Sequence, residues 1–174
     1  MRRVRYAVAA SLDGYIAGPK GEADWIIIDP AIDFESFFKQ FDTVLLGRRT
    51  FEAMAREGRP GIPGMETYVF SRKLRQRNYP DVTILGEQSS ETLATLRSKS
   101  GKDIWLFGGG SLFHSLLNAG LVDTIEVAII PVLLGGGIPL LAPPAKQTKL
   151  NLTGHKVYKT GIASLEYAVQ QPAA

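Results

Sequence analysis

The sequence DIWLFGGGSLF at residues 103–113 decides the fold of this chain. Its apolar start is typical of a buried strand, and the glycines after it, with Ser111 as the expected N-cap, predict an immediate turn into a helix. Glycine lets a ligand approach the backbone closely, and the free N–H groups at a helix start favour an anion. The stretch therefore predicts either a phosphate site or a plain strand-to-helix turn, and these residues alone do not separate the two.

The same layout occurs a second time, earlier in the chain. A predicted strand at residues 43–46 ends in Gly47, and Arg48, Arg49 and Thr50 precede a helix that is expected to begin near Phe51. Two cationic side chains and a hydroxyl group at the positive end of a helix dipole favour an anion. Two such sites in one chain strengthen the interpretation of a phosphate-bearing ligand.

The order of the predicted elements indicates an α/β fold. An aromatic stripe (Phe34, Phe37, Phe38 and Phe41) after the pair Asp29-Pro30 predicts a first helix. Strands and helices alternate over the first two thirds of the chain, and the last strands, at residues 124–132, 149–158 and 162–169, follow without helices. We expect one domain, residues 1–174, with a mixed, mostly parallel sheet and a C-terminal antiparallel hairpin.

Composition excludes several classes of function. The 174 residues contain no cysteine, so disulfides, thiolate zinc sites and cysteine nucleophiles are absent, and the two histidines lack metal-ligand spacing. The net charge is only +3, and the basic run of residues 72–77 has no aromatic residue for base stacking. We therefore expect a small-molecule ligand, no metal and no nucleic acid.

One uncharged stretch, residues 127–145, nearly reaches the length of a membrane span. It contains four prolines and the triplet Gly135-Gly136-Gly137, which would leave backbone groups unsatisfied in lipid. We interpret it as a strand followed by a loop, expect no membrane interaction, and expect the protein in the cytoplasm.

Several motifs in order resemble the dihydrofolate reductase superfamily, and within it the reductase domain of the riboflavin-biosynthesis deaminase-reductase. They are Ser11-Leu-Asp-Gly-Tyr-Ile-Ala17, Asp24-Trp-Ile26, Leu46-Gly-Arg-Arg-Thr-Phe51, Val69-Phe-Ser-Arg72, Phe107-Gly-Gly-Gly-Ser-Leu112, Leu117–Asp123, Pro131–Gly135 and Gly137–Leu141. The resemblance covers most of the chain and implies a stand-alone reductase with the three-layer dihydrofolate reductase-like fold.

The resemblance also implies NADPH as the cofactor and assigns residues to it. Ser71 and Arg72 are expected at the 2′-phosphate, and Ala10 and Ile16 against the nicotinamide. The pyrophosphate would lie between the two helix starts, at Gly47, Arg48, Arg49 and Thr50 and at Gly108, Gly109, Gly110, Ser111 and Leu112. Since the cofactor carries the chemistry, the protein mainly has to place it and exclude water.

A proton donor and a substrate surface are less clearly marked. Asp13, and after it Asp33, are the candidate acids, although Asp13 is also the first residue of an Asp-Gly turn. Trp25 and Phe38 are candidate substrate-stacking surfaces, with core packing as the alternative for both. The family dimerises commonly, so we expect a homodimer; the apolar strand at residues 125–130 would line either that interface or a core.

Two departures from the riboflavin branch bear on the substrate. Where that branch has a lysine and a glutamate, this chain has Ala7 and Phe107. Both changes remove polar contacts to a sugar phosphate, which favours a flatter, pterin-like or pyrimidine-type heterocycle. The alternative is a sensor that binds NADPH without turnover.

Overall fold

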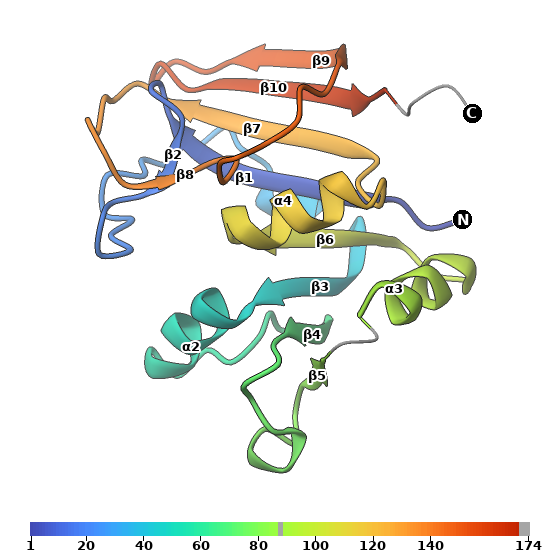
Figure 1. Cartoon of the computed structure of the whole chain (residues 1–174). Helices are drawn as coiled ribbons and strands as arrows, with labels where there is room; N and C mark the ends of the chain where they lie inside the picture. The colour runs from blue at the N-terminus through green and yellow to red at the C-terminus, as the bar shows by residue number, and fades with distance from the viewer. Residues whose placement is uncertain (87–88, 171–174) are drawn as a thin grey trace.

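The computed structural model describes residues 1–86 and 89–170, and an eight-stranded sheet is its main feature (Figure 1). In chain order the elements are β1 (Val4–Ser11), β2 (Tyr15–Ala17), α1 (Phe34–Phe38), β3 (Phe41–Gly47), α2 (Arg48–Arg56), β4 (Glu66–Phe70), the 3-10 helix η1 (Gln76–Asn78), β5 (Thr83–Leu85), α3 (Ser89–Ser98), β6 (Asp103–Gly108), α4 (Gly110–Asn118), β7 (Thr124–Ile130), β8 (Ile138–Pro139), β9 (Leu150–Val157) and β10 (Ala163–Val169).

The sheet has the strand order β5-β4-β3-β6-β1-β7-β10-β9. Neighbours from β5 to β7 run parallel, whereas β10 is antiparallel to both β7 and β9. The predicted mixed sheet with a C-terminal antiparallel hairpin is therefore confirmed. Because β1, β3, β4 and β6 are parallel, their carboxyl ends lie at one edge of the sheet, where ligands bind in open α/β folds.

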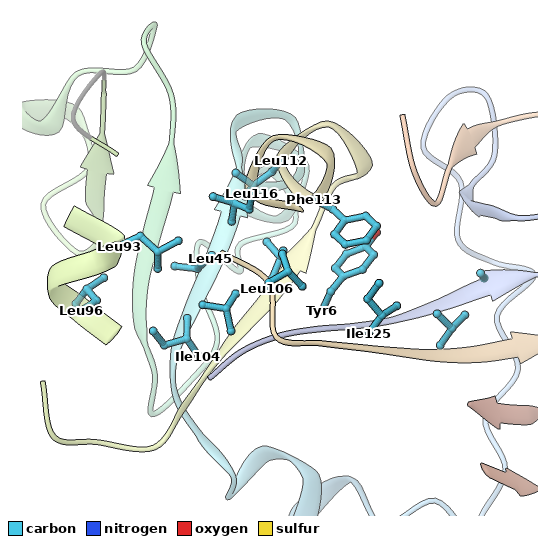
Figure 2. Close-up of a cluster of buried hydrophobic side chains, with 14 residues drawn as sticks. Tyr6, Leu45, Leu93, Leu96, Ile104, Leu106, Leu112, Phe113, Leu116 and Ile125 are labelled. Atoms are coloured by element: carbon cyan, nitrogen blue, oxygen red, sulfur yellow. The ribbon is translucent and has the colours of Figure 1, made fainter. Parts of the chain in front are cut away.

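One face of the sheet is covered by α3 and α4 (Figure 2). Alternate residues of β1 point into this layer, and Tyr6 stacks on Phe113 of α4 with ring centroids 3.8 Å apart. Fully buried Leu45 and Leu106 pack beside them. Each such side chain stabilises the fold by about 1.5–3 kcal/mol relative to exposure.

The opposite face carries a second cluster, contributed by α1 and α2. Trp105 and Val44 belong to it, one position away from the residues of the first cluster on the same strands, as strand alternation requires. Phe51 of α2 is fully buried here, and Phe37 of α1 contacts the Trp105 ring edge-on at 5.3 Å. Helices, sheet and helices thus form the three predicted layers.

The first helix is shorter than predicted and begins later. It spans only Phe34–Phe38, and Asp33, not Asp29, is its N-cap. The buried Asp29 carboxylate instead accepts hydrogen bonds from Ala31 N and from Thr160 N and Oγ1, at the hairpin turn between β9 and β10. Phe41, predicted on the helix stripe, is the first residue of β3.

Two helices begin earlier than predicted, since α2 starts at Arg48 rather than near Phe51, and α4 starts before Ser111. Ser111 is exposed in the first turn of α4, and Gly109 is the N-cap, so the helix starts before the serine. A side chain at Gly110 would collide with the carbonyl oxygen of Pro139, so glycine is required at this helix start. That proline belongs to β8, which pairs with β2 in a small second sheet that the sequence did not predict.

Candidate functional site

Two helices begin side by side at the carboxyl edge of the sheet. Gly47 is the N-cap of α2 and Gly109 is the N-cap of α4, and neither helix has a side-chain hydrogen bond at its cap. The first N–H groups of a helix have no partner within it. Both helix starts therefore offer backbone donors and the positive end of a dipole to an anion.

Close packing of glycine backbone brings these two starts together. β3 and β6 are parallel neighbours, with Leu46 opposite Gly108. A Cβ atom on Gly47 would lie 3.4 Å from Gly109 N, and one on Gly109 would lie 3.4 Å from Thr50 Oγ1. Side chains at these glycines would fill the space in which a ligand could contact both helices.

The side chains predicted around the helix starts differ in what they can contribute. Arg48 forms an ion pair with Glu52 one turn along α2, at 2.8 Å, whereas Arg49 is exposed. Thr50 is half-buried beside Gly109. Leu112 is buried in the first core cluster, so only its backbone N–H is placed to meet a ligand.

A surface pocket of about 340 Å³ lies beyond the carboxyl ends of β4 and β5. It is lined by Ser71, Arg72, Leu74, Arg75, Gln76, Ile84 and Gly86. The predicted pair Ser71 and Arg72 is therefore at one pocket. Arg75 and Gln76 had not been assigned to a site, although the basic run 72–77 was visible in the sequence.

The two residues expected at the nicotinamide belong to one hydrophobic cluster, Ala10 in β1 and Ile16 in β2. Ala10 is buried, and Ile16 of β2 packs partly buried against the cluster that contains it. The same cluster includes Leu112 of α4, so this apolar surface adjoins the glycine-capped helix. The strand β2 is held there by pairing with β8.

The Asp13 carboxylate links two loops. It accepts hydrogen bonds from Ser11 Oγ at 2.6 Å, from Gly135 N at 2.7 Å and from Leu134 N at 3.1 Å. The bond from Ser11, together with those from the two amides, lowers the pKa of the Asp13 carboxyl below its ordinary value. Asp13 is therefore ionised at neutral pH, and a proton-donating role for it stays a prediction.

Asp33 lies elsewhere and has its own structural role. Its side chain accepts the Ser36 N–H at 2.9 Å and so caps α1. That backbone hydrogen bond lowers the pKa of the Asp33 carboxyl. The structure does not bring Asp13 and Asp33 into one hydrogen-bond network, and a catalytic role for Asp33 also stays a prediction.

The two aromatic residues expected at the substrate have different surroundings. Phe38 is half-exposed, and its ring contacts Phe34 at 6.1 Å, Phe37 at 5.6 Å and Trp105 at 5.7 Å. Trp25 instead donates its indole N–H to Glu22 O at 3.0 Å. The ring centroids of half-buried Phe107 and Trp105 are 5.0 Å apart, so Phe38, Trp105 and Phe107 form an aromatic row, with Phe107 next to Gly108 in sequence. Phe38 and Phe107 thus pack against buried Trp105 and leave part of their own rings exposed.

The described residues give no support to a metal centre. No group of three or more His, Asp or Glu residues within 1–86 and 89–170 is arranged to hold a metal ion. Across the same part of the chain, no helix is both long and apolar enough to span a membrane.

Comparison with known proteins identifies relatives along nearly the whole chain. The family model described as the RibD C-terminal domain matches residues 2–164. The uncharacterized protein YyaP of Bacillus subtilis is 33% identical over 178 residues, which cover 95% of this chain and 94% of YyaP.

Solved structures with the same fold include two of similar length. A putative riboflavin biosynthesis protein from Shewanella sp. PV-4 has a TM-score of 0.82 at 23% identity and covers 98% of this chain and 100% of its own. Dihydrofolate reductase from Enterococcus faecalis, solved in complex with NADP(H) and RAB-propyl, has a TM-score of 0.71 at 20% identity and covers 97% of both chains. The fold is dihydrofolate reductase-like.

Proposed function

This chain belongs to the RibD C-terminal domain family, and we propose that it is an NADPH-dependent reductase that transfers a hydride to a pterin-like or pyrimidine-type heterocycle. The observation that carries the proposal is the pair of adjacent helix starts capped by Gly47 and Gly109. They lie at the sheet edge where the fold binds ligands, and the cationic pocket at Ser71 and Arg72 follows the neighbouring strand.

The residues present fit a dinucleotide phosphate. Uncapped N–H groups at α2 and α4 match a pyrophosphate, and glycine leaves the space that it would need. The pocket at Arg72 supplies a cation for a further phosphate, which favours NADPH over NADH. The Enterococcus reductase, which shares this fold, was solved with NADP(H), so this cofactor is the first to test.

Bound NADPH would supply the hydride, and the residues of the chain would hold and shield it. Backbone donors from Gly110 to Leu112 and from Arg48 to Thr50 bind the pyrophosphate. Ala10 and Ile16 give the nicotinamide an apolar surface that keeps water away from the transfer face. Positioning of this kind contributes to rate without a reactive side chain.

The proton that accompanies the hydride has a less obvious source. The lowered pKa values of Asp13 and Asp33 keep both carboxyls ionised at neutral pH, which does not suit a general acid. We propose that Asp13 chiefly holds the loop at Leu134 and Gly135 against β2, and that water protonates the product.

An apolar, planar substrate fits the aromatic row. Phe107 stands at the end of β6, directly before the glycines, and its half-buried ring cannot accept the hydrogen bonds that a glutamate would. Phe38 adds a half-exposed ring that contacts Trp105. A pterin or pyrimidine ring can stack on such a surface.

Turnover tests the proposal against a protein that only binds the cofactor. The purified chain is mixed with NADPH and, in turn, dihydrofolate, dihydropterins and pyrimidine precursors of riboflavin, and loss of the nicotinamide absorbance is followed. Oxidation with any of them supports the reductase. Saturable NADPH binding with no turnover across the panel would favour the sensor, which the structure also accommodates because its cofactor site needs no catalytic group.

A further inference from the structure

A single side chain closes the loop that forms the cationic pocket. Gln76 Nε2 donates to Val82 O at 2.6 Å and to Tyr79 O at 3.0 Å, while Gln76 Oε1 accepts from Ile84 N at 2.8 Å. All three partners are backbone groups on the return path of the loop into β5. The amide of one glutamine thus ties η1 to the part of the segment that leads into β5.

The start of the same loop is fixed independently. Ser71 N donates to Leu85 O at 2.8 Å, and Ser71 Oγ accepts from Lys73 N and Leu74 N at 3.1 and 3.0 Å. Beyond this turn the chain reaches Arg75, the N-cap of η1, which lines the pocket together with Arg72. Two arginines of the basic run therefore border one cavity.

The cations of this pocket are available to a ligand as far as the described residues extend. Over residues 1–86 and 89–170, no carboxylate lies within ion-pair distance of Arg72 or Arg75, whereas Arg48 is paired with Glu52. Arg77 belongs to the same basic run and is exposed, but it is not one of the residues that line the cavity. The loop geometry thus selects two of its three arginines.

We propose that Arg75 is a second phosphate-binding residue of this pocket and that Gln76 is the positioning residue that holds it there. The inference rests on the proposed function and extends it, because it names what sets the preference for a 2′-phosphorylated dinucleotide. A phosphate monoester carries about −1.5 to −2 charges at pH 7. One guanidinium leaves part of this charge uncompensated, whereas two can neutralise it.

Arg75→Ala tests the proposed role of Arg75 in phosphate binding, with Arg77→Ala as its matched control. Both variants lose one positive charge from the same basic run, so they change the long-range attraction of an anion equally. Arg75→Ala should lower the affinity for NADPH by about 10-fold, because it removes one hydrogen bond between a charged side chain and the phosphate. NADH affinity should stay unchanged in both variants, and Arg77→Ala should bind NADPH nearly as the wild type does.

Gln76→Met tests the proposed positioning role of Gln76, because methionine keeps the length of the side chain and removes its hydrogen-bond donor and acceptor. The control is Gln170→Met, which removes an exposed hydrogen bond to Asn151 near the end of β10. Gln76→Met should lower the ratio of NADPH to NADH affinity as Arg75→Ala does. A lower melting temperature with an unchanged ratio would show a merely structural role and overturn the assignment of Gln76.

Binding of NADPH and NADH to the wild type separates this inference from the proposed function. If the wild type binds neither dinucleotide, both fail. If it prefers NADPH and Arg75→Ala keeps that preference, or Arg77→Ala loses as much affinity, only the role of Arg75 is overturned. If the preference falls in Arg75→Ala and Gln76→Met but in neither control, the inference stands.

Discussion

Gly47 and Gly109, which are 62 positions apart in sequence, lie in near contact: a Cβ atom on Gly47 would stand 3.4 Å from the amide nitrogen of Gly109. Each residue caps the helix that follows it. Two positive helix ends are therefore adjacent, and neither of the capping residues has a side chain. The proposed cofactor site depends on this approach more than on any reactive group.

Gly47→Ala should fold and lose affinity for NADPH. The backbone of Gly47 has φ −76 and ψ 155, which alanine adopts readily, and the added methyl group would meet its nearest neighbours at van der Waals distance. It would, however, occupy space against the pyrophosphate, so we expect a loss of about 10-fold, equivalent to one charge-assisted hydrogen bond. Isothermal titration calorimetry measures it.

Gly136→Ala is the control for this change. A Cβ atom at Gly136 would have no neighbour within 4 Å, and its φ lies outside the range that favours glycine. Equal NADPH affinity in both variants and the wild type would mean that the cofactor does not lie between α2 and α4.

Arg72→Ala should lower the affinity of the protein for NADPH much more than its affinity for NADH. Arg72 lines the pocket at the end of β4, and its guanidinium would bind the phosphate that NADH lacks. Lys73→Ala removes the same charge from the next residue, which does not line the pocket, and should leave the ratio of the two affinities unchanged. If Arg72→Ala weakens both dinucleotides equally, Arg72 does not bind the 2′-phosphate.

Asp13→Asn should lower stability and leave turnover largely intact. An ionised carboxylate accepts the hydrogen bonds from Ser11 and Gly135 better than an amide does. Because the folded pKa of Asp13 lies below its ordinary value of 3.8, its contribution is complete above that pH and is lost as the pH falls through the folded pKa. The difference in melting temperature between wild type and variant should therefore shrink below about pH 4.

The pH profile of turnover distinguishes this structural role from catalysis. If Asp13→Asn folds and binds NADPH but loses turnover across the whole pH range, Asp13 is the proton donor after all. If Asp13 has only a structural role, the turnover of Asp13→Asn should depend on pH as that of the wild type does, including at alkaline pH.

Leu152→Asp should dissociate the expected homodimer. β9 is an edge strand, and Leu150, Leu152 and Val157 are 38%, 55% and 73% exposed on it. Exposed apolar side chains on an unpaired edge are typical of an association surface. Sedimentation velocity of the variant should give the monomer, while Ala94→Asp on the exposed surface of α3 keeps the wild-type mass. A monomeric wild type would contradict the expectation.

Periodicity and composition predicted much of this fold because those signals are local. Alternation placed Val4 and Tyr6 on one face of β1, and the run at residues 124–132 was predicted as a strand with Ile125 and Val127 together. The glycine stretch after Phe107 predicted the turn into α4. These patterns reflect burial, which decides which face of each strand is apolar.

Long-range contacts explain where local patterns failed. Asp29 was predicted as a helix cap, but its carboxylate accepts a hydrogen bond from Thr160, 131 positions away. Ser111 was predicted as the N-cap of α4, but Gly109 is the N-cap, and the approach of Pro139 requires glycine at position 110. Gln76 carried no sequence signal, because its role depends on the backbone of Val82 and Ile84. Such partners become visible only once the chain has folded.

Titration of the wild-type protein with NADPH and with NADH, followed by tryptophan fluorescence and by thermal shift, tests the central claim most directly. The account predicts saturable binding of both, tighter for NADPH, with a melting temperature that rises with ligand concentration. A folded protein that shows neither a fluorescence change nor a thermal shift at high NADPH would contradict it.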